Sequence, residues 1–389
     1  MIPEAIGELL RPLEEFEALR RRAARLGSGV CDLSYANPYG GAQQEAIAAL
    51  RQVLDEPRLL DLQYTPFGGQ TLARRHVADA LRASHGLAFC FRDVILTPGA
   101  MSALQLALSA TVSASEEVVI PVPCWLDYPV YAHHVGAVPV SVPPCKETGR
   151  LNVAGIAAAI SDKTRVVLLS HPANPTGENY DSQTLAALAE ALAEREAALG
   201  IELTVVADET HRDFTRPGSF HSLARHFPRT LIVYSFGKYH FLQGQRIGYL
   251  AVSPAHPERK DLARELERWT RITGIATPTA LMQRALPRLL ALSHDHNWLD
   301  DWRGRVTTRL RRAGYGVVAA EATLFVYVET PAGWDDWEFA AALAARGVLV
   351  LPAPVFHHTG HFRLALTASG DMLTRALDVL EEMATSCAA

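Results

Sequence analysis

The chain has 389 residues, of which 49% are hydrophobic and 20% are charged, and its formal net charge is −5. These values are typical of a soluble globular protein that is long enough for two domains. The slight excess of acidic residues leaves no basic footprint for nucleic acid. The sequence contains no run of about 18 apolar residues, so it predicts no membrane span. We therefore expect neither a nucleic-acid partner nor a membrane partner.

The N-terminal residues 1–27 predict an amphipathic helix, not a signal peptide. Acidic residues come early and arginines come late, an order that suits the helix dipole, and Gly27 is a plausible end. The five cysteines form no C-x-x-C pair, which argues against a disulfide frame or a zinc site and indicates a reducing, cytoplasmic location. They are Cys31, Cys90, Cys124, Cys145 and Cys387.

The first helix is followed by residues 31–41, a polar loop that is rich in turn-forming residues and contains Tyr35. A second turn, at Gly68 and Gly69, predicts the start of a helix. Tyr64 lies just before this turn, and on its own it would be interpreted as a packing aromatic.

Residues 94–104, VILTPGAMSAL, predict a strand, a glycine turn and the start of a helix. Gly99 allows the backbone to approach a ligand closely. The helix start at Ala100 and Met101 offers free N–H groups to an anion. An ordinary strand-to-helix turn is the simpler alternative.

The next apolar runs lead to Trp125, Asn174 and Asp208, each just past the end of a predicted strand or at its end. Residues 231–234, LIVY, predict one more buried strand of a parallel sheet, followed by Ser235 and Lys238. In open α/β sheets, ligands bind outside the carboxyl ends of the strands. We therefore expect these polar side chains to meet at one site.

Helical stretches at 182–198, 259–271 and 279–292 alternate with these strands, as a doubly wound α/β domain requires. From residue 293 the pattern changes to helix, strands and helix. The predicted fold class is α/β, with a large, doubly wound, mostly parallel sheet domain and a smaller α+β domain. The expected division is an N-terminal segment that joins the small domain (1–50), a large ligand-binding domain (51–292) and a small C-terminal domain (293–389).

Two other patterns could suggest different chemistry. The stretch from Gly314 to Ala319 fits G-x-G-x-x-A, but it follows a predicted helix instead of a strand, so the context for dinucleotide binding is missing. His357, His358 and His361 could suggest a metal, yet their spacing fits no standard zinc set. We expect no metal site, and interpret residues 357–361 as a polar loop near the substrate.

Several motifs occur together and in a definite order: Asn174-Pro-Thr-Gly, Asp208, Ser235-x-x-Lys238 and Arg246. This set resembles the fold-type I pyridoxal-phosphate (PLP) enzymes, specifically the class I/II aminotransferase family. The resemblance extends from roughly Tyr35 to Arg363. It implies PLP as the cofactor, and an amino group that moves between an α-amino acid and a 2-oxo acid through a Schiff base on Lys238.

The resemblance also implies roles around the cofactor ring. Asp208 would pair with the pyridinium nitrogen and keep it protonated, because a nearby opposite charge favours the charged form. Asn174 would bond the phenolic oxygen, and it is also a candidate for contact with the substrate. Trp125 would stack on the ring. Ser235 and Arg246 would bind the phosphate together with the turn at Gly99, Ala100 and Met101.

Further roles follow for the substrate and for a second subunit. Arg363 would bind the substrate α-carboxylate, which suits a planar guanidinium. Tyr35, in the entrance loop, is a weaker candidate for substrate binding. The resemblance further implies a homodimer with shared active sites, in which Tyr64 reaches the cofactor phosphate of the neighbouring subunit.

Three positions depart from the family pattern. His211 stands where tyrosine is usual, Gly237 precedes the lysine where Ser or Thr is usual, and Ala322-Thr323 replaces frequent glycines. His211 could take over the tyrosine's contact with the cofactor, or it could be a core residue. We interpret it as a cofactor-binding residue.

These departures leave two enzymatic outcomes open. The first is transamination, and the second is elimination, replacement, cyclisation or oxidation of an amino acid on the same scaffold, as in specialised metabolism. A PLP-sensing transcription regulator fits less well. Only about thirty residues precede the resemblance, too few for a helix-turn-helix module and its linker.

Overall fold

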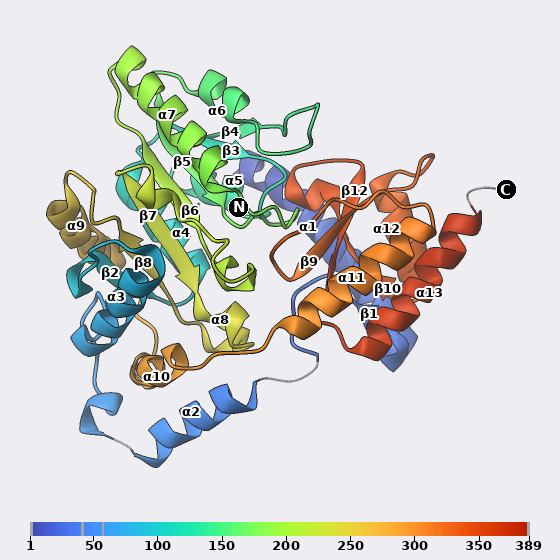
Figure 1. The fold of residues 1–389 in the computed structure, drawn as a ribbon, viewed down its shortest axis with the longest axis horizontal. Coiled ribbons are helices and arrows are strands. Elements are labelled where there is room, and N and C mark those ends of the chain that lie inside the picture. Colours follow the sequence, from blue (N-terminus) through green and yellow to red (C-terminus); the bar gives the residue numbers. More distant parts are fainter. Residues whose placement is uncertain (1–2, 40–42, 57, 387–389) are drawn as a thin grey trace.

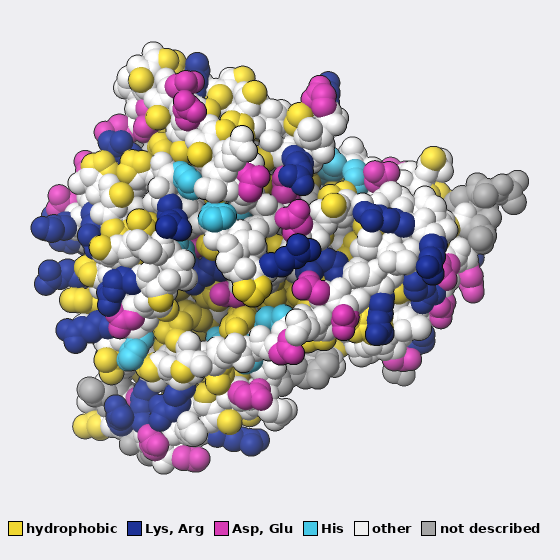
Figure 2. Space-filling model, viewed as in Figure 1, with side chains coloured by type: hydrophobic (Ala, Val, Ile, Leu, Met, Phe, Trp, Pro, Cys, Tyr) yellow, Lys and Arg dark blue, Asp and Glu magenta, His cyan; other side chains and the backbone are white. Residues whose placement is uncertain are grey.

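The computed structural model describes residues 3–39, 43–56 and 58–386. Its elements form a large body around one wide sheet and a second body around two small sheets (Figure 1). On the face seen in Figure 2, acidic and basic side chains are interspersed over most of the surface.

A seven-stranded sheet forms the centre of the large body. Its strand order is β2-β8-β7-β6-β5-β3-β4, and β8 is antiparallel to both of its neighbours while every other neighbouring pair is parallel. The prediction of a large, mostly parallel sheet is therefore confirmed. The strands are β2 (Val94–Thr97), β3 (Glu117–Pro121), β4 (Val138–Val142), β5 (Thr164–Ser170), β6 (Thr204–Asp208), β7 (Thr230–Ser235) and β8 (Gly248–Val252).

Helices cover both faces of this sheet, which explains why its central strands are apolar throughout. In β7, Leu231 and Val233 pack with α4, α5 and α9, whereas Ile232 and Tyr234 pack with α2, α3 and α10. Successive side chains of a strand point to opposite faces, so both faces need apolar residues here. The helices of this body are α2 (Gln44–Asp55), α3 (Thr71–His85), α4 (Ala100–Thr111), α5 (Tyr128–His134), α6 (Val153–Ala159), α7 (Ser182–Leu199), α8 (Phe236–Tyr239), α9 (Arg259–Ile272) and α10 (Ala280–Leu290).

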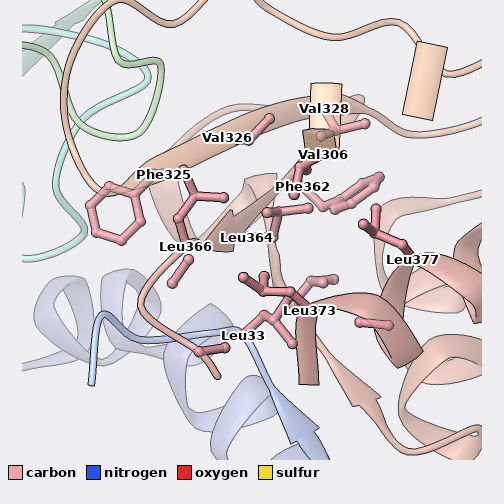
Figure 3. Close-up of a cluster of buried hydrophobic side chains, with 14 of the residues drawn as sticks. Leu33, Val306, Phe325, Val326, Val328, Phe362, Leu364, Leu366, Leu373 and Leu377 are labelled. Carbon is pink, nitrogen blue, oxygen red and sulfur yellow. The ribbon is translucent and has the colours of Figure 1, made fainter. Parts of the chain in front are cut away.

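The second body joins the N-terminal segment to the C-terminal part. Strand β1 pairs with β10, and the antiparallel sheet β11-β12-β9 lies beside them. Leu33 shares a core with Phe325, Phe362 and Leu373 (Figure 3). The elements are α1 (Glu4–Ala23), β1 (Cys31–Asp32), α11 (Asn297–Arg312), β9 (Phe325–Glu329), α12 (Asp336–Ala345), β10 (Val348–Leu349), β11 (Leu351–Pro352), β12 (His361–Ala365) and α13 (Gly370–Ser386).

Short 3-10 turns connect these elements. The end of α1 and the position of α2 differ from the expectations based on sequence. Helix α1 ends at Ala23, before Gly27, because the chain tightens into a 3-10 turn. Helix α2 packs with α10 and α3 through Ala46 and Val53, so a boundary at residue 50 falls inside one helix of the large body. The turns are η1 (Ala24–Gly29), η2 (Leu59–Leu62), η3 (Phe91–Asp93), η4 (Arg212–Phe214), η5 (Leu223–Arg225), η6 (Gln243–Gln245) and η7 (Ala353–Phe356).

Two further properties concern the described part of the chain. No helix in it combines the length and the apolar character needed to cross a membrane. Cys31, Cys90, Cys124 and Cys145 are free thiols, and Cys387 lies outside the described residues.

Candidate active site

The polar strand ends of the large sheet meet at one cavity of about 190 Å³. Lys238 comes from α8, Asp208 from the end of β6 and Asn174 from the turn after β5. Because these strands are parallel, their carboxyl ends lie at the same edge of the sheet. The other lining residues are Ala100, Met101, Leu104, Trp125, Ser170, Thr210, His211, Ser235, Gln243 and Arg246.

Lys238 lies in α8, a one-turn helix that begins directly after β7. The Oγ of Ser235 accepts a hydrogen bond from the N–H of Gly237 at 3.3 Å and so caps this helix. Burial, together with the nearby cations Arg363 and Arg246, lowers the pKa of Lys238 to about 8. A larger share of the amine is therefore neutral near pH 7, and the neutral amine is the form that reacts with an aldehyde.

Asp208 is buried at the end of β6, and two donors hold its carboxylate. The Oη of Tyr128 donates to one oxygen at 2.8 Å, and the backbone N–H of Thr210 donates to the other at 3.0 Å. Burial raises the pKa of Asp208, while these hydrogen bonds act in the opposite direction. Sequence reasoning missed Tyr128, whose one signal is its position three residues after Trp125 at the start of α5.

The turn between β2 and α4 forms a cradle for an anion. Gly99 has a φ of 85°, which favours glycine, and the guanidinium of Arg246 approaches so closely that a Cβ there would lie 2.7 Å from its Nη2. Arg246 is held by hydrogen bonds to the carbonyl oxygens of Gln243 at 3.0 Å and Pro98 at 3.4 Å. The first turn of α4 adds free N–H groups beside this charge.

Arg363 is a buried cation that no carboxylate neutralises among the described residues. Its guanidinium lies 3.7 Å from the ring centroid of Phe325 and donates to Oδ1 of Asn174 and to the carbonyl oxygen of Ser34, both at 2.8 Å. Nε is buried without a hydrogen-bond partner, and burial lowers the pKa of Arg363 to about 9. An unpaired buried charge is costly, and a bound carboxylate would relieve this cost.

His211 lies in the wall of the cavity and is almost fully buried. Its ring meets Phe325 edge-on at 5.5 Å between centroids, and its Nδ1 has no hydrogen-bond partner within the described chain. Burial, followed by the positive charges of Lys238 and Arg363, holds the pKa of His211 well below 6.5. The imidazole is therefore neutral at neutral pH and has one buried nitrogen to offer to a ligand.

The other two departures from the family pattern have visible packing consequences. A Cβ at Gly237 would lie 3.0 Å from Cα of Gln243, so the backbone of the neighbouring turn leaves little room for Ser or Thr. Thr323 has a φ of 69°, which L-residues rarely adopt, and it is fully buried. The adjacent Ala322 donates its N–H to the carbonyl oxygen of Gly177 at 3.0 Å.

Four predicted residues do not line this cavity: Gly99, Arg363, Tyr64 and Tyr35. Gly99 and Arg363 each contact a lining residue, Arg246 and Asn174 respectively. Tyr64 is fully exposed and lines a separate groove beside Asp61 and Arg284. Tyr35 donates its hydroxyl to Glu17 at 3.1 Å and packs on Phe16. The structure therefore does not bring Tyr35 to the cavity wall, and Tyr64 is free to meet another molecule.

The histidines of the 357–361 loop contact Leu126 and Tyr327. His357 Nε2 lies 2.9 Å from the carbonyl oxygen of Leu126, and His358 Nδ1 lies 3.1 Å from Oη of Tyr327. His361 stacks on the ring of Tyr327 at 4.7 Å. No group of three or more His, Cys, Asp or Glu side chains in the described chain is arranged to hold a metal ion.

Comparison with known proteins agrees with this geometry. The model of the family "Aminotransferase class I and II" matches residues 28–380. The chain belongs to the class I and II aminotransferases. This aminotransferase is 26% identical to the aspartate aminotransferase of Bacillus subtilis over 375 residues, 90% of each chain. It is 28% identical to the aspartate/prephenate aminotransferase of Cereibacter sphaeroides over 377 residues, 92% of this chain and 91% of that one.

Solved structures show the same fold. An aminotransferase from Eubacterium rectale matches with a TM-score of 0.90 at 24% identity over 99% of both chains. The aspartate aminotransferase of Thermotoga maritima matches with a TM-score of 0.87 at 22% identity, over 99% of this chain and all of that one. The fold prediction, the family and the enzyme class are thus confirmed.

The aminotransferase is therefore a PLP-dependent enzyme that moves an amino group between an amino acid and a 2-oxo acid. The site fits PLP on two observations, and a third fits the substrate. Gly99 leaves a cradle that a Cβ would fill, His211 has an unpartnered buried nitrogen, and the buried Arg363 lacks a carboxylate. These match a phosphate, a polar ring substituent and a substrate carboxylate, respectively.

Proposed function

We propose that Lys238 holds PLP and moves the proton during amino transfer in this enzyme. The observation that carries the proposal is a lysine with a pKa lowered to about 8 that lines a cavity together with Asp208 and Asn174. When bound, PLP supplies an electron sink for the substrate α-carbon. Lys238 would carry the proton between that carbon and the cofactor as a general base and then a general acid.

The other residues of the cavity would bind and orient. Asp208, kept in place by Tyr128, would face the ring nitrogen with its negative charge. Asn174 and the neutral His211 would offer hydrogen bonds to the phenolic oxygen. Trp125 would form one wall of the ring site.

The two arginines would bind the charged ends of the ligands. Arg246 and the turn at Gly99, Ala100 and Met101 would bind the phosphate. Arg363 would bind the substrate α-carboxylate, and such binding would supply the counter-charge that its buried guanidinium lacks.

The test is to trap the cofactor covalently on its lysine. Borohydride reduction of the holoenzyme, followed by proteolysis and mass mapping, should find PLP on Lys238. Lys238→Ala should lose both the adduct and the visible absorbance. Lys163→Ala, at an exposed position, is the matched control and should keep both. An adduct on another lysine would refute the assignment.

The same preparation separates the two enzymatic outcomes. Transamination converts one amino acid to a 2-oxo acid for each 2-oxo acid that is aminated, and it releases no ammonia and consumes no oxygen. Ammonia release or oxygen uptake in step with substrate loss would contradict amino transfer as the main reaction.

We further propose that the enzyme is a homodimer with shared active sites. The support comes from the family and from one segment, in which Leu59, Leu62 and Tyr64 have relative exposures of 74%, 87% and 107%. Exposed apolar residues that gather on one segment are typical of an interface. Sedimentation velocity at micromolar concentration should show a dimer that Leu62→Glu weakens. Leu26→Glu, at a leucine that is 56% exposed elsewhere, should leave it intact.

Subunit mixing tests whether Tyr64 acts across the dimer. Lys238→Ala and Tyr64→Phe each damage a different part of the proposed site. A mixed dimer would contain one site with both wild-type residues. Mixing the two variants after mild dissociation should therefore restore activity, and failure to restore it in confirmed mixed dimers would contradict shared sites.

We also propose a cytoplasmic location and the division into an N-terminal segment, a large domain and a small domain. The four free cysteines support the first proposal, and cell fractionation tests it. The contacts of α2 with α10 support placing the whole of residues 43–292 in the large domain, a small shift from a boundary at residue 50. Limited proteolysis that cut first within α2 would contradict this shift.

A further inference from the structure

The turn after β6 presents two pairs of side chains on opposite sides. Asp208 and His211 line the cavity. Glu209 and Arg212, each one residue later, contact each other at 3.3 Å on the far side. The backbone N–H of Arg212 also donates to the carbonyl oxygen of Glu209 at 3.1 Å, which closes the turn. The positions of Asp208 and His211 are therefore tied to the positions of Glu209 and Arg212.

Glu209 is fully buried, and three donors surround its carboxylate. Ser222 Oγ donates at 2.5 Å to one oxygen, while His85 Nε2 at 2.8 Å and Arg212 share the other. Burial alone would raise the pKa of Glu209, yet His85, Arg212 and Ser222 together lower it to about 2. The carboxylate is therefore charged in the folded protein and needs every donor that it has.

His85 has a hydrogen-bond partner at each ring nitrogen. Ser84 donates its hydroxyl to the carbonyl oxygen of Ala80 at 2.9 Å, and its Oγ lies 2.7 Å from Nδ1 of His85. Nε2 of His85 faces the ionised Glu209 at 2.8 Å, where it serves as a donor to the carboxylate. The ring of His85 is locked between the rings of Phe89 and Phe220, each at 6.0 Å between centroids.

Arg212 extends the network to the strands that flank the site. It donates to Oη of Tyr249 at 2.8 Å and lies 4.2 Å from the ring centroid of Tyr234. Tyr234 in turn donates to Asp213 at 2.5 Å. The strands β7 and β8 are thus joined to the turn that carries Asp208 and His211.

Such a network is a costly way to stabilise a fold. Burying an ion pair removes two charges from water, and apolar residues of the same volume often stabilise as well or better. Buried ionic groups can instead specify one geometry. The His85–Glu209 pair lies directly behind the residues that would contact the cofactor, where geometry matters most.

We propose that His85 is a positioning residue of this aminotransferase, which acts through Glu209 to hold Asp208 and His211 against the cofactor. This inference rests on the proposed roles of Asp208 and His211. His85 itself does not line the cavity.

The test uses the holoenzyme and the variants His85→Leu and His85→Gln. Leucine cannot donate to Glu209, whereas the amide of glutamine can. His85→Leu should lower kcat by about 10- to 100-fold, because small displacements at a reacting centre have effects of this size. KM should change much less. The visible circular dichroism of the bound cofactor, which reports its orientation, should change with kcat, and His85→Gln should partly restore both.

A matched control separates positioning from stability. His256 is also buried, and its Nδ1 accepts the N–H of Glu258 at 3.1 Å, outside the network. His256→Leu should lower the free energy of unfolding without changing the dichroism or kcat of folded molecules. Ser222→Ala removes a single donor from Glu209 and provides a milder variant if His85→Leu does not fold.

The outcomes are distinguishable from a failure of the proposed function. If wild-type enzyme does not carry PLP on Lys238, the site assignment itself is wrong. If PLP is trapped on Lys238, but His85→Leu and Ser222→Ala match the wild-type dichroism and kcat, the network is merely structural and the inference is overturned.

Discussion

Gly248 offers a sharp test of how packing supports the active site. It is the first residue of β8 and pairs with Thr97 on one side and Ser235 on the other. A Cβ at this position would lie 2.3 Å from the carbonyl oxygen of Tyr234 and 3.0 Å from Cα of Gly99. Both neighbours are backbone, so no side chain can move aside.

The size of the effect of Gly248→Ala follows from these distances. The optimal separation of non-bonded heavy atoms is about 3.5 Å, so the backbone would have to open by about 1 Å. Overpacking of this kind costs about 1–3 kcal/mol, and a central strand with neighbours on both sides should lie near the upper end. Opening toward Gly99 would also move the anion cradle, so PLP affinity should fall by about tenfold or more.

Urea unfolding of the apoenzyme and PLP titration measure the two effects separately. Gly304→Ala is the matched control, because Gly304 lies within α11 and an added Cβ would meet nothing within 4 Å. That change should stabilise the protein by up to about 1 kcal/mol, since alanine is the better helix former. A Gly248→Ala protein with wild-type unfolding and wild-type PLP affinity would refute the packing argument.

Three other predictions concern ionisable groups in or beside the cavity. His211→Phe should raise the pH midpoint of the visible absorbance of the bound cofactor, because phenylalanine cannot donate to the phenolic oxygen; superimposable titrations would show that His211 does not touch the cofactor. Arg363→Lys should raise KM for the amino acid by about 10- to 100-fold, because lysine lacks the bidentate fork; an unchanged KM would remove Arg363 from the substrate site. Uptake of PLP by the apoenzyme should speed up with rising pH and level off above about pH 8, since only neutral Lys238 reacts; a rate that still rises beyond pH 10 would contradict its lowered pKa.

Local pattern was enough to predict much of the large domain. The continuous apolar run at 231–234 indicated a strand covered on both faces, and helices do cover both faces of β7. The polar residues that end these runs indicated the edge of the sheet where Lys238, Asp208 and Asn174 meet. Such inferences succeed because strand periodicity and strand-end position are local properties of the chain.

Contacts between distant segments could not be predicted in this way. Tyr128 and Asp208 are 80 residues apart, and their hydrogen bond depends on how α5 packs on the sheet. Arg363 reaches Asn174 only because β12 lies against the large domain. Helix α2 belongs to that domain because it packs against α10. The exposure of Tyr64 is likewise a property of the folded surface.

The sequence by itself determined the strands, the chemistry of their ends and the family resemblance, because each depends on residues that are close together in the chain. Only the tertiary structure decided which side chains support the turn after β6 on the side away from the cavity. Glu209 and Arg212 read as ordinary charges in the sequence, and they acquire a role because the sheet order brings His85, Ser222 and Tyr249 around them. Electrostatic effects such as the lowered pKa of Lys238 arise in the same way, from burial and from the cation of Arg363, which is distant along the chain.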